Sequence, residues 1–150
     1  MGWNCEDDDY NLYLFPIDKV ETSVGWWHIG PKDKPYGLSA RGFEHATRKD
    51  SLFFKFHDDF FKTTKAKALT FKILWLDNNK GSWNFCYDAG GKNLKTGRTF
   101  IGKGTNTWRE DYVTVSDAIM KKGGPRGSDI ALINTGKKDY IFHIIEVERK

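Results

Sequence analysis

The acidic residues are the first candidates for chemistry in this sequence. Glycoside hydrolysis needs two carboxyl groups that face each other across a cleft, one of them with a raised pKa. The acidic pairs here, Asp58-Asp59 and Glu110-Asp111, are sequence neighbours beside expected turns. Adjacent side chains on a strand point to opposite faces, so neither pair forms such a dyad. We therefore interpret these acids as solvated loop residues and predict no catalytic residue.

The sequence also contains no motif for binding a metal ion or a cofactor. The histidines do not have the short spacing that places two imidazoles on one metal ion; they are His28, His45, His57 and His143. No nucleophile elbow, Walker loop or dinucleotide-binding glycine motif occurs, and Gly102-Lys103-Gly104 does not open a helix. The sequence thus predicts a protein that is not an enzyme and has no cofactor.

A structural calcium ion is the one metal whose binding the sequence leaves undecided. Calcium requires several oxygen ligands that converge from loops. Suitable side chains occur near expected turns, namely Asp77, Asn78, Asp88, Asp117 and Asp129. Whether they converge does not follow from the sequence, and no acidic loop has the ligand density of a dedicated calcium site.

The elements expected to position these residues are mainly β-strands. Along residues 66–77, apolar side chains alternate on one face of an expected strand, at Leu69, Phe71, Ile73 and Trp75. Residues 77–81 tolerate left-handed backbone, and Trp83, Phe85 and Tyr87 alternate after them, so we predict a β-hairpin. Further strands are expected at residues 26–29, 52–56, 98–101, 112–115, 129–133 and 140–147, with helical turns only at 57–61 and 116–121.

About nine short strands predict one all-β domain over residues 1–150, with residues 1–9 as a flexible lead-in. The strand spacing favours an antiparallel two-sheet β-sandwich with jelly-roll topology. No apolar stretch approaches the roughly 18 to 20 residues of a membrane span, so we expect no membrane span. Residues 1–9 lack a signal-peptide pattern, although the chain could be a piece of a longer secreted protein.

Charge and cysteine content narrow the partners only slightly. The net charge of +4 is too low for a dedicated nucleic-acid binder, although basic residues interleave with aromatics near Lys62–Lys67 and Lys92–Arg98. We expect no nucleic-acid partner and a monomer. Cys5 and Cys86 are the two cysteines, and their pairing is open.

The segment 69–88, LTFKILWLDNNKGSWNFCYD, resembles accessory β-sandwich modules of bacterial polysaccharide-degrading enzymes. In those modules a hydrophobic strand ends in aromatic-x-Asp, turns through Gly and returns on alternating aromatics that end in Tyr-Asp. The match continues in order over residues 37–149, and its further parts are 39–41, 53–56, 58–60, 107–108, 117–118, 127–130 and 144–149.

The resemblance implies a non-catalytic carbohydrate-binding module that targets a parent glycoside hydrolase or lyase to polysaccharide. It places the protein outside the cell or at the cell surface, as part of a secreted bacterial enzyme. The partners would be a polysaccharide or oligosaccharide and the catalytic domain, and the positive charge favours an acidic or sulfated glycan. The alternative is a structural sandwich that packs against the catalytic domain without binding glycan.

Sugar-binding sites use exposed aromatic faces with a few convergent polar groups. Trp75, Trp83 and Trp108 fall on motif strands, where we expect core packing. If Trp26 and Trp27 lie on a strand, one ring points outward and is available to ligand. The predicted ligand-binding residues are Trp26, Trp27 and His28, with Tyr36 as a second platform and Arg41 as a clamp for hydroxyl or sulfate groups. The alternative role for Arg41 is that of a structural ion-pair residue.

Overall fold

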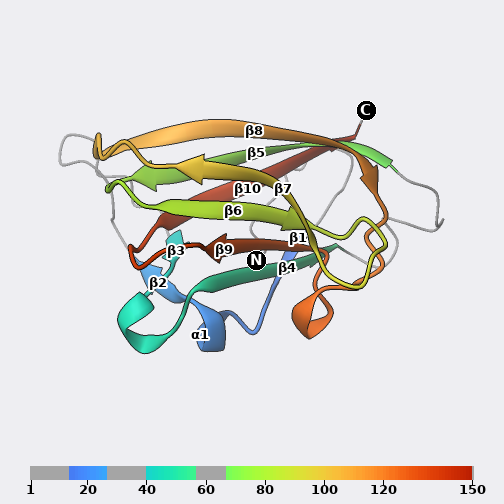
Figure 1. The fold of residues 1–150 in the computed structure, drawn as a ribbon, viewed down its shortest axis with the longest axis horizontal. Helices are drawn as coiled ribbons and strands as arrows, with labels where there is room; N and C mark the ends of the chain where they lie inside the picture. Colours follow the sequence, from blue (N-terminus) through green and yellow to red (C-terminus); the bar gives the residue numbers. More distant parts are fainter. Residues whose placement is uncertain (1–13, 27–39, 57–66, 150) are drawn as a thin grey trace.

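The fold consists of two antiparallel β-sheets of five strands each (Figure 1). The structure is a computed structural model, and it describes residues 14–26, 40–56 and 67–149. The strands are β1 (Leu14–Ile17), β2 (Val24–Trp26), β3 (Ala40–Gly42), β4 (Ser51–Phe56), β5 (Lys67–Asp77), β6 (Ser82–Tyr87), β7 (Lys95–Ile101), β8 (Thr107–Ala118), β9 (Ile130–Asn134) and β10 (Ile141–Arg149). The helical elements are the helix α1 (Lys19–Thr22) and the 3-10 turns η1 (His45–Thr47) and η2 (Pro125–Gly127).

The strand order is that of a jelly roll. The β4 sheet has the order β1-β4-β9-β6-β7, and the β5 sheet has the order β2-β3-β10-β5-β8. From β3 onward, successive strands alternate between the two sheets, except for the hairpin of β6 and β7. This alternation interleaves two Greek keys, so the predicted all-β jelly-roll sandwich is confirmed.

One predicted hairpin is wrong. Residues 77–81 connect β5 to β6, but β5 pairs with β10 and β8, whereas β6 pairs with β9 and β7. The turn therefore crosses from one sheet to the other, and Trp75 meets Trp83 across the core with ring centroids 5.4 Å apart. Alternation of apolar residues assigns a side chain to a face of a strand, and it does not identify the strand that lies alongside.

The predicted helical turn at 116–121 is also wrong, because β8 continues to Ala118. Asp117 accepts hydrogen bonds from the hydroxyl of Tyr87 at 2.5 Å and the ammonium of Lys95 at 2.6 Å, so its carboxylate ties β8 to β6 and β7 and does not cap a helix. The other expected helical turn, 57–61, lies outside the described residues, as do residues 27–29 of the expected strand that β2 begins.

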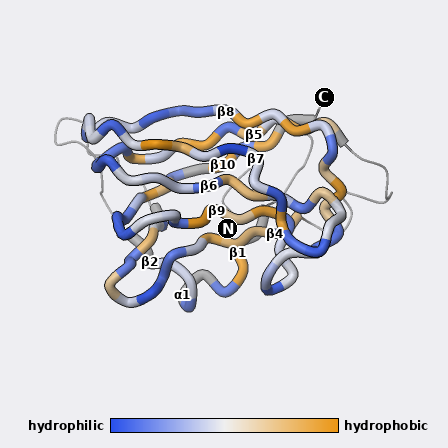
Figure 2. Tube along the Cα trace, in the orientation of Figure 1, coloured by the Kyte–Doolittle hydropathy of each residue, from blue (hydrophilic) through white to orange (hydrophobic). Residues whose placement is uncertain are grey.

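The core lies between the sheets and is rich in aromatic rings. Trp83 stacks on Phe100 at 4.3 Å, and Phe71 packs against Phe85 at 4.9 Å. Figure 2 shows hydrophobic residues concentrated along β4, β5 and β9, and a long hydrophilic stretch in β8. Burial of this apolar surface is the dominant favourable term in folding. No helix among the described residues is long and apolar enough to span a membrane.

Two arginines close the edge of the sandwich between β7 and β8. Arg98 of β7 donates to the carbonyl of Tyr112 at 2.9 Å, and Arg109 of β8 donates to the carbonyl of Ile101 at 3.2 Å. The guanidinium of Arg98 lies over the ring of Phe100, and that of Arg109 lies over Trp75. These contacts fix the position of β8 and therefore of the side chains on both its faces.

Candidate binding surface

The predicted aromatic platform lies mostly outside the described residues. Trp26 ends β2, where its backbone pairs with Ala40 of β3. Trp27, His28 and Tyr36 fall in a segment that the structure does not describe. Their contact with ligand stays a prediction.

Arg41 is held by the residue that precedes β2. Its Nε donates to the hydroxyl of Ser23 at 3.0 Å, and its Nη2 donates to the carbonyl of Ser23 at 3.1 Å. Burial lowers the pKa of this half-buried guanidinium. Arg41 thus ties β3 to the start of β2, and its use as a clamp for ligand stays a prediction.

The three motif tryptophans do not share one role. Trp75 and Trp83 are fully buried between the sheets, as predicted. Trp108 instead packs on the outer face of the β5 sheet, against Leu76 and Ile141. The core-packing prediction is therefore wrong for Trp108. The sequence contains a signal for this outer position. Val113 and Val115 are buried on the inner face of β8, and because side chains alternate along a regular strand, an even-numbered residue such as Trp108 falls on the outer face.

An apolar patch surrounds Trp108. Trp108 pairs with Leu76 across β8 and β5, and Leu76 pairs with Ile141 across β5 and β10. The ring of His143 meets the indole edge-on at a centroid distance of 6.3 Å. We call Leu76, Trp108, Ile141 and His143 the Trp108 patch. The indole Nε1 of Trp108 is buried and has no hydrogen-bond partner among the described residues.

A second aromatic ring lies further along the same face of β8. Tyr112 is four residues from Trp108, which on a strand corresponds to about 13 Å. Its side chain is 52% exposed, and its hydroxyl donates to Glu110 at 2.9 Å. This hydrogen bond is the main cause of a raised Tyr112 pKa. The outer face of β8 therefore presents two separated rings with a carboxylate between them.

Charged side chains from the neighbouring strands complete this surface. Lys72 of β5 contacts Glu146 of β10 at 2.9 Å and approaches Glu110 of β8 at 3.9 Å. The hydrogen bond to Glu146 is the largest cause of the raised Lys72 pKa. Beyond them, the hydroxyls of Thr70 and Thr114 lie 3.1 Å apart. Donors and acceptors thus lie along the same face as the two rings.

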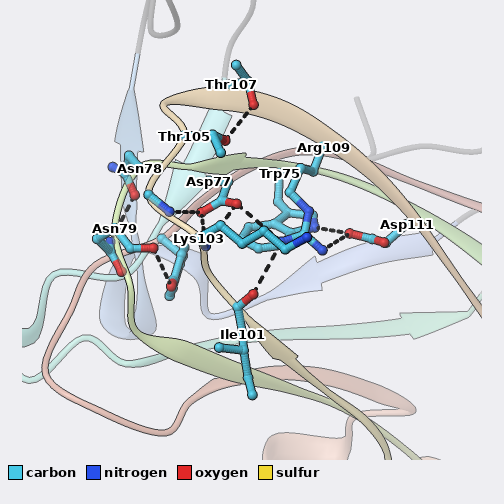
Figure 3. Close-up of polar contacts among 12 residues, drawn as sticks. Trp75, Asp77, Asn78, Asn79, Ile101, Lys103, Thr105, Thr107, Arg109 and Asp111 are labelled. Carbon is cyan, nitrogen blue, oxygen red and sulfur yellow. Dashed lines mark hydrogen bonds and ion pairs between the residues drawn. The ribbon is translucent and has the colours of Figure 1, made fainter.

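Asp77 anchors the loop that leads into Trp108 (Figure 3). Its buried carboxylate accepts hydrogen bonds from the backbone N–H groups of Lys103 and Gly104, both at 2.9 Å. Arg109 donates to the same carboxylate at 3.2 Å and contacts Asp111 at the same distance. The candidate calcium ligand Asp77 is therefore already satisfied by protein donors.

Two further calcium candidates serve loops at the other end of the sandwich. Asp88 accepts backbone hydrogen bonds from Gly90, Lys121 and Gly123. Asp129 accepts them from Phe56 and Lys122, and burial raises its pKa. Within the described ranges, no three His, Cys, Asp or Glu side chains gather as metal ligands. These carboxylates hold backbone amides, and a structural calcium ion stays an untested prediction.

Glu110 and Asp111 lie inside β8, so their interpretation as loop acids is wrong, whereas their side chains point to opposite faces of the strand as the alternation predicted. Glu110 contacts Tyr112 on the outer face, whereas Asp111 accepts a hydrogen bond from the Trp75 indole at 2.8 Å. Cys86 is free and buried, and burial is the main cause of its raised pKa. Cys5 lies outside the described residues.

No family model and no curated protein matches the sequence. Among solved structures, the chain is similar to a glycoside hydrolase family 43 arabinoxylan arabinofuranohydrolase from Bacillus subtilis in complex with cellotetraose. The identity is 15%, the match covers 85% of this chain and 24% of that one, and the TM-score is 0.47. The chain thus spans about a quarter of the hydrolase.

Two smaller proteins match along most of both chains. A family 61 carbohydrate-binding module in complex with β-1,4-galactotriose is 12% identical, with 94% of this chain and 90% of that chain covered and a TM-score of 0.44. The K1 cleaved adhesin domain of Lys-gingipain from Porphyromonas gingivalis is 10% identical, with 95% and 88% covered and a TM-score of 0.41. Likenesses this distant transfer no ligand or activity to the present chain.

Proposed function

We propose that the chain is a carbohydrate-binding module that holds a polysaccharide on the outer face of β8, β5 and β10. The observation that carries the proposal is the pair of aromatic rings, Trp108 and Tyr112, on one face of β8. A pyranose presents a C–H-rich face that stacks on an electron-rich ring. The separation of about 13 Å along the strand suits a glycan chain and exceeds the size of one sugar.

Polar groups between the rings suit the hydroxyls of the same ligand. Glu110 lies between the two rings in the strand, and Lys72 and Glu146 lie on the adjacent strands of the face. Carboxylates accept hydrogen bonds from sugar hydroxyls, and an ammonium donates them. An apolar platform with a small number of positioned polar groups is the general form of a small-molecule site.

The charge of this face favours a glycan over a packed catalytic domain. The side chain of Glu110 is 51% exposed, and that of Lys72 is 29% exposed. The central parts of protein interfaces are depleted of charged residues. In this proposal the module directs a secreted bacterial hydrolase or lyase to its polysaccharide, and the region of Trp26 and Trp27 provides a second contact.

Affinity electrophoresis of the whole chain in gels that contain plant, algal or host glycans tests the proposal. We expect at least one glycan to retard the protein. Tyr112→Ala should abolish most of the retardation because it removes an exposed ring, whereas Tyr112→Phe should keep it. Ile101→Ala is the matched control, since Ile101 is 67% exposed and lies on β7 of the other sheet.

Trp108→Ala should also weaken binding, and its thermal unfolding must be recorded because Trp108 is half-buried. Loss of retardation in a folded Trp108→Ala protein supports the site. If no glycan retards the parent protein, the proposed function is wrong. If a glycan retards the parent and both alanine variants equally, the chain binds carbohydrate at another surface.

A further inference from the structure

Four lysines gather at the end of the sandwich that borders the Trp108 patch. They lie in three loops, with Lys80 in residues 78–81, Lys103 in residues 102–106, and Lys137 and Lys138 in residues 135–140. Each loop joins a strand next to a residue of the patch: Leu76 precedes the first loop, Trp108 follows the second and Ile141 follows the third. We call these four lysines the lysine rim.

Hydrogen bonds hold the three loops against one another. The side-chain amide of Asn79 donates to the carbonyl of Asp139 at 2.7 Å, and Gly102 N–H donates to the carbonyl of Gly81 at 2.9 Å. In addition, Asn134 donates to the carbonyl of Lys138 at 2.9 Å. The lysine rim is therefore carried by backbone that is fixed before any ligand arrives.

Close approaches between the loops place two of the lysines. A Cβ built on Gly81 would lie 2.9 Å from the Cβ of Lys138, so this side chain lies directly over the loop that carries Lys80. A Cβ on Gly104 would lie 3.5 Å from Cγ of Lys80, which places Lys80 over the loop that carries Lys103. The three loops thus carry these lysines at one end of the molecule.

The nearby acids offset only part of the positive charge of the lysine rim. All four lysines are exposed, and none forms an ion pair within the described residues. Asp77 is buried and paired with Arg109, and Asp50 contacts His45. Exposed Asp139 lies in the same loop as Lys137 and Lys138 and offsets one of the four positive charges, while its carboxylate accepts a hydrogen bond from the backbone N–H of His45 at 2.8 Å. Unpaired like charges at one end create a positive potential that attracts anions.

We propose that the lysine rim binds the carboxylate or sulfate groups of an acidic polysaccharide while Trp108 stacks on a sugar ring of the same chain. The inference rests on the proposed function, because it names the class of glycan for the same surface. An acidic glycan supplies both chemistries found here, a ring with a C–H face and a regularly repeated anion. Lys72 contributes little to anion binding because Glu146 and Glu110 already surround it.

A nucleic acid fits this end of the molecule less well. Single-strand binders combine a positive groove along the backbone with several aromatic rings on which successive bases stack. Trp108 packs on the patch beside the lysine rim, whereas Trp75 and Trp83 are fully buried, and the net charge of the whole chain is only +4. We therefore commit to a glycan and use an oligonucleotide as a competing ligand in the test.

The test compares acidic polysaccharides with their neutral counterparts in affinity electrophoresis and calorimetry of the whole chain. The probes are polygalacturonate with its fully methyl-esterified form, and a sulfated galactan with agarose. The rim variant is Lys80→Gln/Lys103→Gln. The control is Lys92→Gln/Lys121→Gln, which removes the same charge from exposed lysines at the opposite end of the sandwich.

We expect tighter binding to at least one acidic probe than to its neutral counterpart. The rim variant should lose about tenfold in affinity for that probe, while the control keeps the parent affinity. Added salt should weaken the parent more steeply than the rim variant, since fewer counterions are released by the variant.

Equal binding of acidic and neutral forms, or equal affinity of the rim and control variants, would overturn the inference while leaving the proposed function in place. Binding of no polysaccharide would overturn both. If a single-stranded oligonucleotide binds more tightly than either acidic glycan and depends on the same two lysines, the lysine rim serves nucleic acid and the inference is wrong.

Discussion

The loops at the two ends of the sandwich (Figure 1) are each held by a buried carboxylate, but the surface cations at the two ends have different surroundings. At the end that borders Trp108, buried Asp77 accepts backbone hydrogen bonds from the loop of residues 102–106. At the opposite end, Asp88 accepts three from the loops of residues 88–94 and 119–129. A buried carboxylate satisfied by backbone amides fixes a loop without regular structure.

The surface cations at the two ends of the sandwich have different neighbours. At the opposite end, Lys95 pairs with Asp117 at 2.6 Å and Arg126 pairs with Asp18 at 2.7 Å. At the Trp108 end, the lysines of the rim have no acidic partner within the described residues. Exposed Lys92 and Lys121 at the opposite end also form no ion pair among the described residues, so the two ends differ in the setting of their unpaired lysines: at the Trp108 end these lysines lie beside an aromatic patch.

The largest expected effect is on stability at the opposite end. Asp88→Ala leaves three backbone N–H groups in the loops without their acceptor. We expect urea denaturation to show a free energy of unfolding lower by about 3 to 5 kcal/mol, with unchanged glycan affinity for the folded protein. Asp139→Ala is the control, because Asp139 is exposed and accepts one backbone hydrogen bond. Equal losses in the two variants would show that Asp88 does not anchor these loops.

A slightly smaller loss of stability is expected at the Trp108 end, together with a loss of binding. Asp77→Ala removes the acceptor of Lys103 and Gly104 and leaves Arg109 without one of its partners. We expect a cost of about 2 to 4 kcal/mol in urea denaturation. Because Lys103 then loses its fixed position, affinity for an acidic glycan should fall several-fold. Unchanged affinity in the folded variant would show that this loop does not take part in binding the ligand.

The smallest of these effects is a loss of stability in alkali. Burial raises the pKa of Tyr140 from 10.0 to about 12. A raised pKa in the folded state means that the stability contributed by Tyr140 is complete below pH 10 and is lost as the pH rises through 12. The free energy of unfolding should fall by about 2 to 3 kcal/mol across this interval. In Tyr140→Phe this fall should disappear, and an identical fall in both proteins would contradict the assignment.

The sequence was sufficient for the fold class because apolar alternation is a local property. Leu69, Phe71, Ile73 and Trp75 all face the core, as the period of two predicts. The pairing of strands is not local, and this is why residues 77–81 were taken for a hairpin turn although they cross between sheets. The extension of β8 through residue 118 depends on contacts of Asp117 with β6 and β7, which the sequence also does not show.

The candidate surface was harder to predict than the fold. The motif predicted that Trp108 packs in the core. Because side chains alternate along β8 and Val113 and Val115 face the core, Trp108 lies on the outer face instead. The lysine rim combines loops separated by up to about 60 residues in the chain, so no local pattern indicates it. The fold class followed from periodicity, whereas the surface required knowledge of which strands and loops are neighbours.

The most direct test of the account is a nuclear magnetic resonance titration in which a glycan that the protein binds is added stepwise. The measured quantities are the chemical shifts of the indole N–H signals of its six tryptophans. The indole of Trp108 should shift with saturating behaviour, because a sugar ring stacked on it changes its magnetic environment. Those of Trp75 and Trp83 should stay close to their positions in the free protein, since both are fully buried. A saturating titration that leaves the Trp108 signal unchanged would contradict the account.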